Sequence, residues 1–251
     1  MAIATSGIFR FFDLPAELRE AILSQLLVSD NDIILHNTTN FIPPLLNTIH
    51  FLNFFLVNMQ MYQEASAIFY SKNRFTLNGQ SHRLPVHLTS RGGFLSEEGQ
   101  DARRRVRSLT LHLTRVGGEF ERVLGPAISD MILSGSLRDL RLRLGPPSWR
   151  APIRPADSDM VLRPPFQALL RLLADPYLET VELLAWKVHL RVLCPFHRKA
   201  TTSSKKDTES VDDQGIAILR DGPGWIELDW KAMVKAFGGG QQIVTIGERK
   251  Y

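Results

Sequence analysis

Apolar and polar residues alternate in three segments in the middle of the chain. Each segment has one apolar residue, two others, and then apolar residues at every second position. Because side chains of a strand point alternately to its two faces, this period of two predicts β-strands with one buried face. The predicted strands lie within Val106–Leu113, Leu137–Leu144 and Leu178–Ala185.

Helical patterns separate these strands. Apolar residues recur at helical spacing in Phe120–Leu133 and in Phe166–Leu173. A strand–helix–strand–helix–strand order predicts parallel pairing with right-handed crossovers. The strand segments resemble leucine-rich repeats, although their spacing along the chain is irregular. A plain α/β or α+β domain is the alternative.

The alternation also predicts what the second face of the sheet carries. If the leucines enter the core, in-register pairing predicts two rows on the other face: Thr110, Arg141 and Glu182 in one, and His112, Arg143 and Leu184 in the next. Repeat proteins generally bind partners on this face. The candidate substrate-binding residues are therefore His112, Arg141, Arg143 and Glu182. The alternative is a solvated face with a weak Arg141–Glu182 pair.

The N-terminal stretch Phe11–Leu27 predicts an amphipathic helix. Leu18, Ile22 and Leu26 recur every four residues and form one apolar face. Pro15 suits the first helical position, because it has no N–H to leave unpaired there.

Shorter elements are predicted on either side of a second helical region. Ile33–Leu35 reads as a short extended piece, and residues 45–70 as one long helix or two helices broken near Asn58. Asn73 is a candidate left-handed helix end, followed by a strand that begins at Phe75. Near the C-terminus we expect a hairpin of Ile216–Leu219 and Trp225–Leu228, and a short helix capped by Asp229 that ends at Phe237.

Two motifs in this region resemble a known family. Leu14–Ile22 is similar to the opening of the F-box, usually written LPxELxxxI, and Phe55–Ala65 followed by Phe69–Phe75 resembles the second signature of fungal F-box-like proteins. The resemblance covers residues 9–78. It implies a helical segment that docks a Skp-type adaptor of a cullin–RING ubiquitin ligase. The residues expected to touch the adaptor are Leu14, Pro15, Leu18, Ile22 and Leu26, with internal core packing as the alternative.

Composition adds limits on class and location. The chain is 44% hydrophobic and 22% charged, with a formal net charge of +4, which is too small an excess for a general field that attracts nucleic acid. The single cysteine, Cys194, excludes an internal disulfide. No signal peptide is apparent, and the apolar run Ile49–Val57 is far shorter than the about 20 residues of a membrane span. We expect a cytoplasmic or nuclear protein without membrane attachment.

The sequence shows no arrangement typical of catalysis. Cys194 and His197 lack an identifiable third group that would orient a nucleophile, and they are too few for a zinc site. We therefore expect a non-enzyme with no metal and no cofactor. The cluster Arg103–Arg107 is a less favoured candidate for nucleic-acid binding, because no aromatic platform or reading helix accompanies it.

Together these patterns predict an α+β chain. It has an F-box-like helical segment at 9–78, a linker at 79–105, a leucine-rich-repeat-like strand and helix region with a short parallel sheet at 106–198, a disordered linker at 199–214, and a hairpin and helix tail at 215–251. The expected function is a non-catalytic substrate receptor that links an unknown client protein to the adaptor. An F-box-like scaffold without ligase attachment is the alternative.

Overall fold

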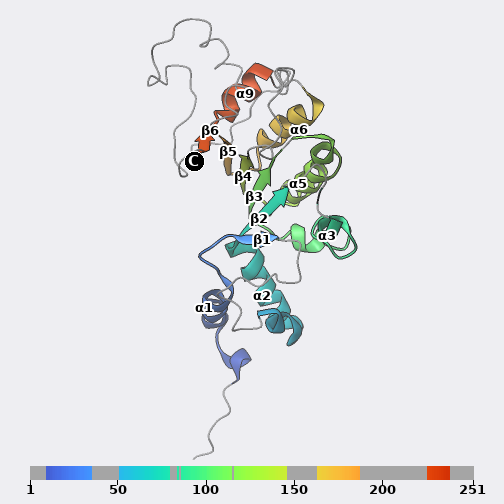
Figure 1. The fold of residues 1–251 in the computed structure, drawn as a ribbon. Coiled ribbons are helices and arrows are strands. Elements are labelled where there is room, and N and C mark those ends of the chain that lie inside the picture. The colour runs from blue at the N-terminus through green and yellow to red at the C-terminus, as the bar shows by residue number, and fades with distance from the viewer. Residues whose placement is uncertain are drawn as a thin grey trace, which may run out of the picture.

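The computed structural model describes residues 10–35, 51–79, 84, 86–114, 116–145, 163–186 and 225–237. These residues form helices and one mixed sheet, joined by loops, so the predicted α+β class is confirmed (Figure 1).

The described strands form a six-stranded sheet in which each strand pairs with its neighbour in the chain. In order they are β1 (Ile33–Leu35), β2 (Arg74–Gly79), β3 (Ser108–Leu113), β4 (Asp139–Leu144), β5 (Thr180–Trp186) and β6 (Trp225–Glu227). The first five are parallel, and β6 runs antiparallel to β5. The three strands predicted by alternation are confirmed as β3, β4 and β5. The extended piece Ile33–Leu35 is confirmed as β1.

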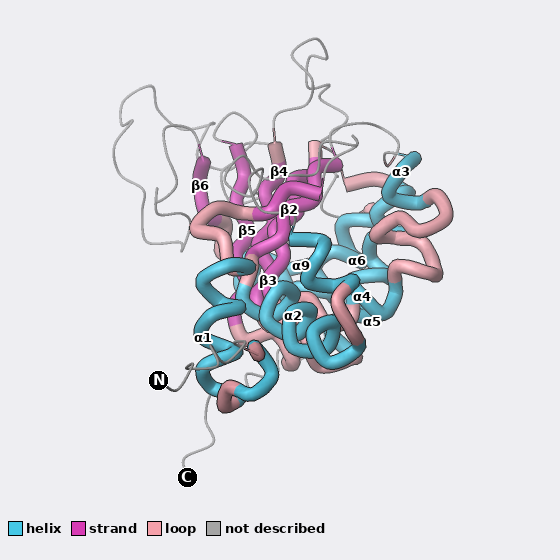
Figure 2. Tube along the Cα trace, turned by 90° about the horizontal axis from the view of Figure 1, so that it is seen from below, coloured by secondary structure: helices cyan, strands magenta, loops and turns pink. Residues whose placement is uncertain are grey.

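Helices connect the parallel strands. α1 (Ala16–Leu27) precedes β1, and the 3₁₀ helix η2 (Phe51–Leu56) and α2 (Met59–Lys72) precede β2. Then follow α3 (Val86–Thr89), α4 (Gln100–Arg103), the π-helical turn η3 (Phe120–Leu124) with α5 (Gly125–Leu133), α6 (Pro164–Leu173) and α9 (Trp230–Phe237). Figures 1 and 2 show α5, α6 and α9 along one side of the sheet. The two helices predicted between β3 and β5 are confirmed.

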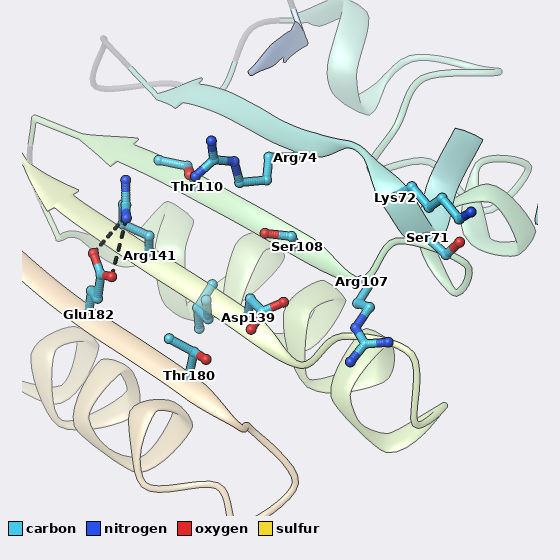
Figure 3. Close-up of a pocket in the computed structure, with 11 residues that line it drawn as sticks. Ser71, Lys72, Arg74, Arg107, Ser108, Thr110, Asp139, Arg141, Thr180 and Glu182 are labelled. Carbon is cyan, nitrogen blue, oxygen red and sulfur yellow. Dashed lines mark hydrogen bonds and ion pairs between the residues drawn. The ribbon is translucent and has the colours of Figure 1, made fainter. Parts of the chain in front are cut away.

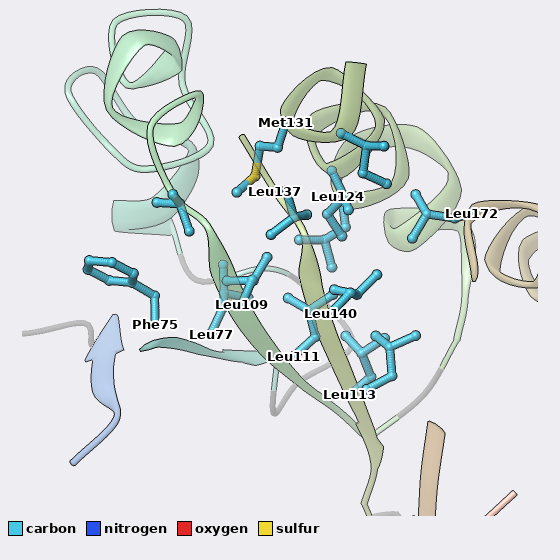
Figure 4. Close-up of a cluster of buried hydrophobic side chains, with 14 of the residues drawn as sticks. Phe75, Leu77, Leu109, Leu111, Leu113, Leu124, Met131, Leu137, Leu140 and Leu172 are labelled. Carbon is cyan, nitrogen blue, oxygen red and sulfur yellow. The ribbon is translucent and has the colours of Figure 1, made fainter. Parts of the chain in front are cut away.

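Alternation along the strands builds the core. Leu109, Leu111 and Leu113 of β3 are buried, as are the leucines paired with them on β4. Figure 4 shows Leu109, Leu111, Leu113 and Leu140 on the side of the sheet that faces Met131 of α5 and Leu172 of α6. The buried cluster is continuous from α1 to α9, and residues 9–78 contribute β1 and β2 to the same sheet. The opposite face of the sheet, called the open face below, carries partly exposed Arg141 and Glu182 beside buried Thr110.

α1 buries a face that does not include the predicted adaptor residues Leu18 and Ile22. Leu23 and Leu27 are its buried residues, whereas Leu18 and Ile22 are exposed. The helix packs against α2. Pro15 lies one residue before the first helical residue, at the N-cap, and not inside the helix.

The break predicted near Asn58 is confirmed, because Asn58 caps α2. Its side-chain oxygen accepts a hydrogen bond from the backbone N–H of Met61 at 2.8 Å. The left-handed conformation predicted for Asn73 is wrong. Asn73 is extended, with φ −90° and ψ 151°, because its side chain is committed to hydrogen bonds with three backbone groups.

The cap predicted at Asp229 is confirmed, since its carboxylate accepts a hydrogen bond from the N–H of Ala232 at 3.0 Å. The other predicted hairpin strand, Ile216–Leu219, lies outside the described residues, as do the linker 199–214 and residues Cys194 and His197. Among the helices that the structure describes, none is long and apolar enough to cross a membrane.

Candidate functional site

The open face of the sheet carries the two rows predicted from alternation. Thr110, Arg141 and Glu182 are register partners across β3, β4 and β5. His112, Arg143 and Leu184 are the next set of partners along the same strands. The predicted register is therefore confirmed, and the four candidate residues His112, Arg141, Arg143 and Glu182 share one face.

The first row is held by an ion pair. The Arg141 Nε lies 2.6 Å from one oxygen of the Glu182 carboxylate, and its Nη2 donates to the other oxygen at 3.2 Å (Figure 3). The two side chains are 28% and 32% exposed. A bidentate contact between two partly buried side chains orients both groups more firmly than a single contact in open solvent would.

The second row lies beside an aromatic side chain from the last described strand. The guanidinium of Arg143 lies 5.9 Å from the centre of the Trp225 ring, and the His112 ring meets Trp225 edge-on at 6.3 Å. Burial lowers the pKa of His112 from its ordinary value of 6.5, the positive charge of Arg143 lowers it further, and Asp32 opposes the shift. This environment therefore favours the neutral imidazole of His112.

The sequence-based prediction of the site did not include Trp225. The sequence predicts a strand at Trp225–Leu228 but pairs it with Ile216–Leu219, so nothing places it beside β5. In the structure β6 pairs with β5, and Glu227 is the register partner of Leu184.

A groove of about 460 Å³ lies on the open face, toward the amino ends of the strands (Figure 3). Hydroxyl side chains from α2, β3 and β5 contribute to its lining. Its charged lining residues are Lys72, Arg74, Arg107 and Arg141, with Asp139 and Glu182. Of these, sequence reasoning placed only Arg141 and Glu182 on this face, and it named Arg107 only as part of the Arg103–Arg107 cluster. The others lie near strand starts and helix ends, where alternation carries no information.

Three of the groove cations have carboxylate partners outside the groove. Lys72 Nζ lies 2.7 Å from a Glu20 oxygen, Arg74 Nε 3.3 Å from Asp32, and Arg107 Nη2 3.4 Å from Glu179. All three cationic side chains are more than 40% exposed. Exposed pairs of this kind contribute little to stability.

α1 presents the second candidate surface. Leu18 is 52% exposed and Ile22 39% exposed, while Pro15 is exposed and Leu14 and Leu26 are half-buried. A shallow depression of about 490 Å³ lies beside Ile22, between α1 and Lys72. Of the five predicted adaptor residues, three therefore lie open to solvent and two are partly covered.

An ion pair fixes α1 against α2. Arg19 donates from Nε and Nη2 to the two oxygens of Glu64, at 2.9 and 2.8 Å, and also donates to the carbonyl of Leu14. The hydrogen bond from Arg19 is the main reason that the pKa of Glu64 lies below its ordinary value. This ion pair helps to fix the rotation of α1 against α2. In that orientation Leu18 and Ile22 face outward.

The cluster Arg103–Arg107 does not form one basic surface, because its arginines take separate partners. Arg103 donates to the backbone carbonyls of Phe94 and Ser96, Arg104 pairs with Asp130 at 2.7 Å, Arg105 donates to Ser66, and Arg107 pairs with Glu179. Buried Arg103 therefore stabilises the loop before α4 through these two hydrogen bonds.

No group of three or more histidine, cysteine, aspartate or glutamate side chains that could hold a metal ion occurs in the part of the chain that the structure describes.

Comparison of the chain with protein-family models, with curated proteins and with solved structures finds no match.

Proposed function

We propose that this chain is a non-catalytic, F-box-like interaction protein. In this proposal α1 docks a Skp-type adaptor of a cullin–RING ubiquitin ligase, and the open face of the sheet holds a client protein. The ligase role would place the protein in the cytoplasm or the nucleus. The adaptor and the ligase enter only through the resemblance of Leu14–Ile22 and Phe55–Phe75 to F-box motifs.

One observation carries the adaptor half of the proposal. Leu18 and Ile22 are apolar, lie one helical turn apart on α1 and are both exposed. Leu23 and Leu27 already attach the helix to the core, so the outer stripe is not needed for folding. Burying such side chains against a partner gains about 25 cal/mol per Å² of apolar area.

The client half is supported by the chain-order parallel sheet. Stacked strand–helix units leave one sheet face open, and repeat proteins bind partners on that face. A receptor of this kind acts by raising the effective concentration of its client near the ligase, so it needs no active site of its own.

The adaptor assignment is tested with the full chain and a purified Skp-type adaptor. We expect the wild type to bind the adaptor and the double variant Leu18→Ala/Ile22→Ala to bind at least tenfold more weakly. Leu133→Ala on α5 is the matched control, because Leu133 is 73% exposed and lies away from α1.

Both variants should keep the thermal stability of the wild type, since the substituted side chains are exposed. If the wild type itself captures no adaptor, ligase attachment is wrong and the scaffold alternative holds. Equal adaptor binding by the double variant and the control would place the contact elsewhere.

A further inference from the structure

We propose that Asp139, in the groove on the open face, binds the side-chain ammonium group of a lysine in the client protein. The proposal deepens the proposed function, because it rests on the assignment of the open face as the client surface. It does not depend on adaptor binding.

The groove offers a ligand a carboxylate that is not already engaged. Each cation of the lining has a carboxylate within ion-pair distance, at 2.7 Å for Lys72, 3.3 Å for Arg74, 3.4 Å for Arg107 and 2.6 Å for Arg141. Asp139 lines the same groove, and within the part of the chain that the structure describes its carboxylate has neither a hydrogen-bond donor nor an ion-pair partner. A cationic ligand would supply that partner.

The sheet fixes the position of Asp139. Its backbone N–H donates to the carbonyl of Arg107 at 3.1 Å, and its register partners are Ser108 on β3 and Thr180 on β5. Register partners share one face of a sheet, and Figure 3 shows Asp139 between these two hydroxyl residues. Ser108 and Asp139 are half-buried and Thr180 is exposed, so a ligand can reach all three.

This set of acceptors suits an ammonium group. Adjacent strands are about 4.8 Å apart, and a charge-assisted N–H···O hydrogen bond is about 2.8 Å long. Twice that length exceeds the strand spacing, so one nitrogen can bridge the Asp139 carboxylate and either neighbouring hydroxyl oxygen. An ammonium has three N–H donors, and each hydroxyl oxygen has lone pairs to accept one.

Other ligands fit the groove less well. A divalent metal ion needs several oxygen ligands, whereas Glu182, the other carboxylate of the lining, is already paired with Arg141. A phosphate-bearing ligand would be repelled by Asp139. Lysine suits the site better than arginine does, because its ammonium is a compact charge with rotatable donors, whereas a guanidinium is a planar fork.

Positive charge at the end of the groove limits the affinity. Glu179 contacts both Arg107, at 3.4 Å, and Arg138, at 3.7 Å. One carboxylate thus balances two guanidinium groups, and their remaining charge opposes any cation nearby. Binding of a single lysine side chain is therefore weak, and its test requires a method that detects weak binding.

The test is an NMR titration of the full chain, labelled with ¹⁵N, with a short glycine–serine peptide that has capped ends and one central lysine. The matched peptide carries Nε-acetyl-lysine, which keeps the side chain and removes its charge. At low salt we expect the lysine peptide to shift the backbone amide signals of Ser108, Asp139 and Thr180. It should bind about fivefold or more tightly than the acetylated peptide. Added salt should weaken its binding.

Asp139→Asn keeps the shape of the side chain and removes its charge, so it should weaken binding of the lysine peptide about fivefold or more. Thr180→Val, which replaces a hydroxyl by a methyl group, should give a smaller loss. Asp101→Asn is the matched control and should leave binding unchanged. Asp101 is exposed on α4, whose Gln100 donates a hydrogen bond to Asp130 of α5 in the helical layer.

Thermal denaturation checks that each variant folds, and the comparison of the two peptides on the wild type needs no variant. Equal binding of the lysine and acetyl-lysine peptides, or equal effects of Asp139→Asn and Asp101→Asn, would overturn the proposal. So would tighter binding of a matched glutamate peptide. Adaptor capture without lysine-peptide binding would reject this proposal alone. Lysine-peptide binding without adaptor capture would support the lysine site and reject only ligase attachment.

Discussion

The side-chain amide of Asn73 donates a hydrogen bond to the backbone carbonyl of Leu27 at 2.9 Å, across 46 positions of sequence. The same amide donates to the carbonyl of Phe69 at 2.8 Å, and its oxygen accepts from the N–H of Ser29. Asn73 is only 1% exposed. One buried side chain thus joins the end of α1, the end of α2 and the start of β2.

Replacing Asn73 by alanine should lower the free energy of unfolding by about 1–3 kcal/mol, because buried backbone groups lose their partner. Urea denaturation measures the change. Asn31→Ala is the control, since Asn31 is exposed and should change stability by less than about 0.5 kcal/mol. Similar losses in the two variants would show that the Asn73 contacts are not formed in solution.

The two leucine environments of the protein should respond very differently to truncation. Leu140→Ala should cost about 2–5 kcal/mol of unfolding free energy, because Leu140 is 1% exposed and its loss leaves a cavity. Leu18→Ala should cost less than about 0.5 kcal/mol, because Leu18 is already 52% exposed. A large loss in Leu18→Ala would mean that α1 is rotated and that its outer stripe is core.

The Arg19–Glu64 pair should make stability depend on pH in the acid range. The folded pKa of Glu64 lies below its ordinary value of 4.5. Its contribution is therefore full above pH 4.5 and is lost as pH falls through the lower, folded value. The stability difference between wild type and Glu64→Gln should shrink as urea denaturation is repeated at falling pH.

Glu121→Gln is the control for this series, because Glu121 is exposed on η3. A wild-type advantage over Glu64→Gln that stays constant from neutral pH to pH 3 would contradict the lowered pKa of Glu64.

His112 should titrate below 6.5 when followed by NMR of its imidazole protons. Burial is the main cause, and the charge of Arg143 adds to it. Arg143→Gln should therefore raise the pKa of His112, and Asp32→Asn should lower it, because Asp32 favours the protonated ring. Shifts in the same direction in both variants would mean that the charge arrangement on this face is misassigned.

The strand pattern was predictable because it is local. Alternation needs only neighbouring residues, and it correctly placed Leu109 and Leu140 in the core and Thr110 beside Arg141 on the open face. The orientation of α1 was not predictable in this way. Leu18 and Ile22 lie on one apolar stripe of the helix, and Leu23 and Leu27 on another. The side chains that hold the helix in place, Glu64 and Asn73, lie 45 and 46 positions from their partners on α1.

The groove illustrates the same limit. Lys72 ends a helix, Arg74 opens a strand and Arg107 closes a loop, so no periodic pattern relates them. They meet because β2 and β3 pair in a register that sets Arg74 opposite Ser108. Only that pairing converts three separated cations into one lining.

The pairing of each strand with its chain neighbour bears on how the molecule assembles and comes apart. No described strand is inserted between two that precede it, so the sheet can grow by one strand at a time and can peel from either edge. Contacts between sequence neighbours of this kind shorten the loops that must close, which speeds folding. The reversed strand β6 ends the parallel series of the described strands, because it runs antiparallel to β5.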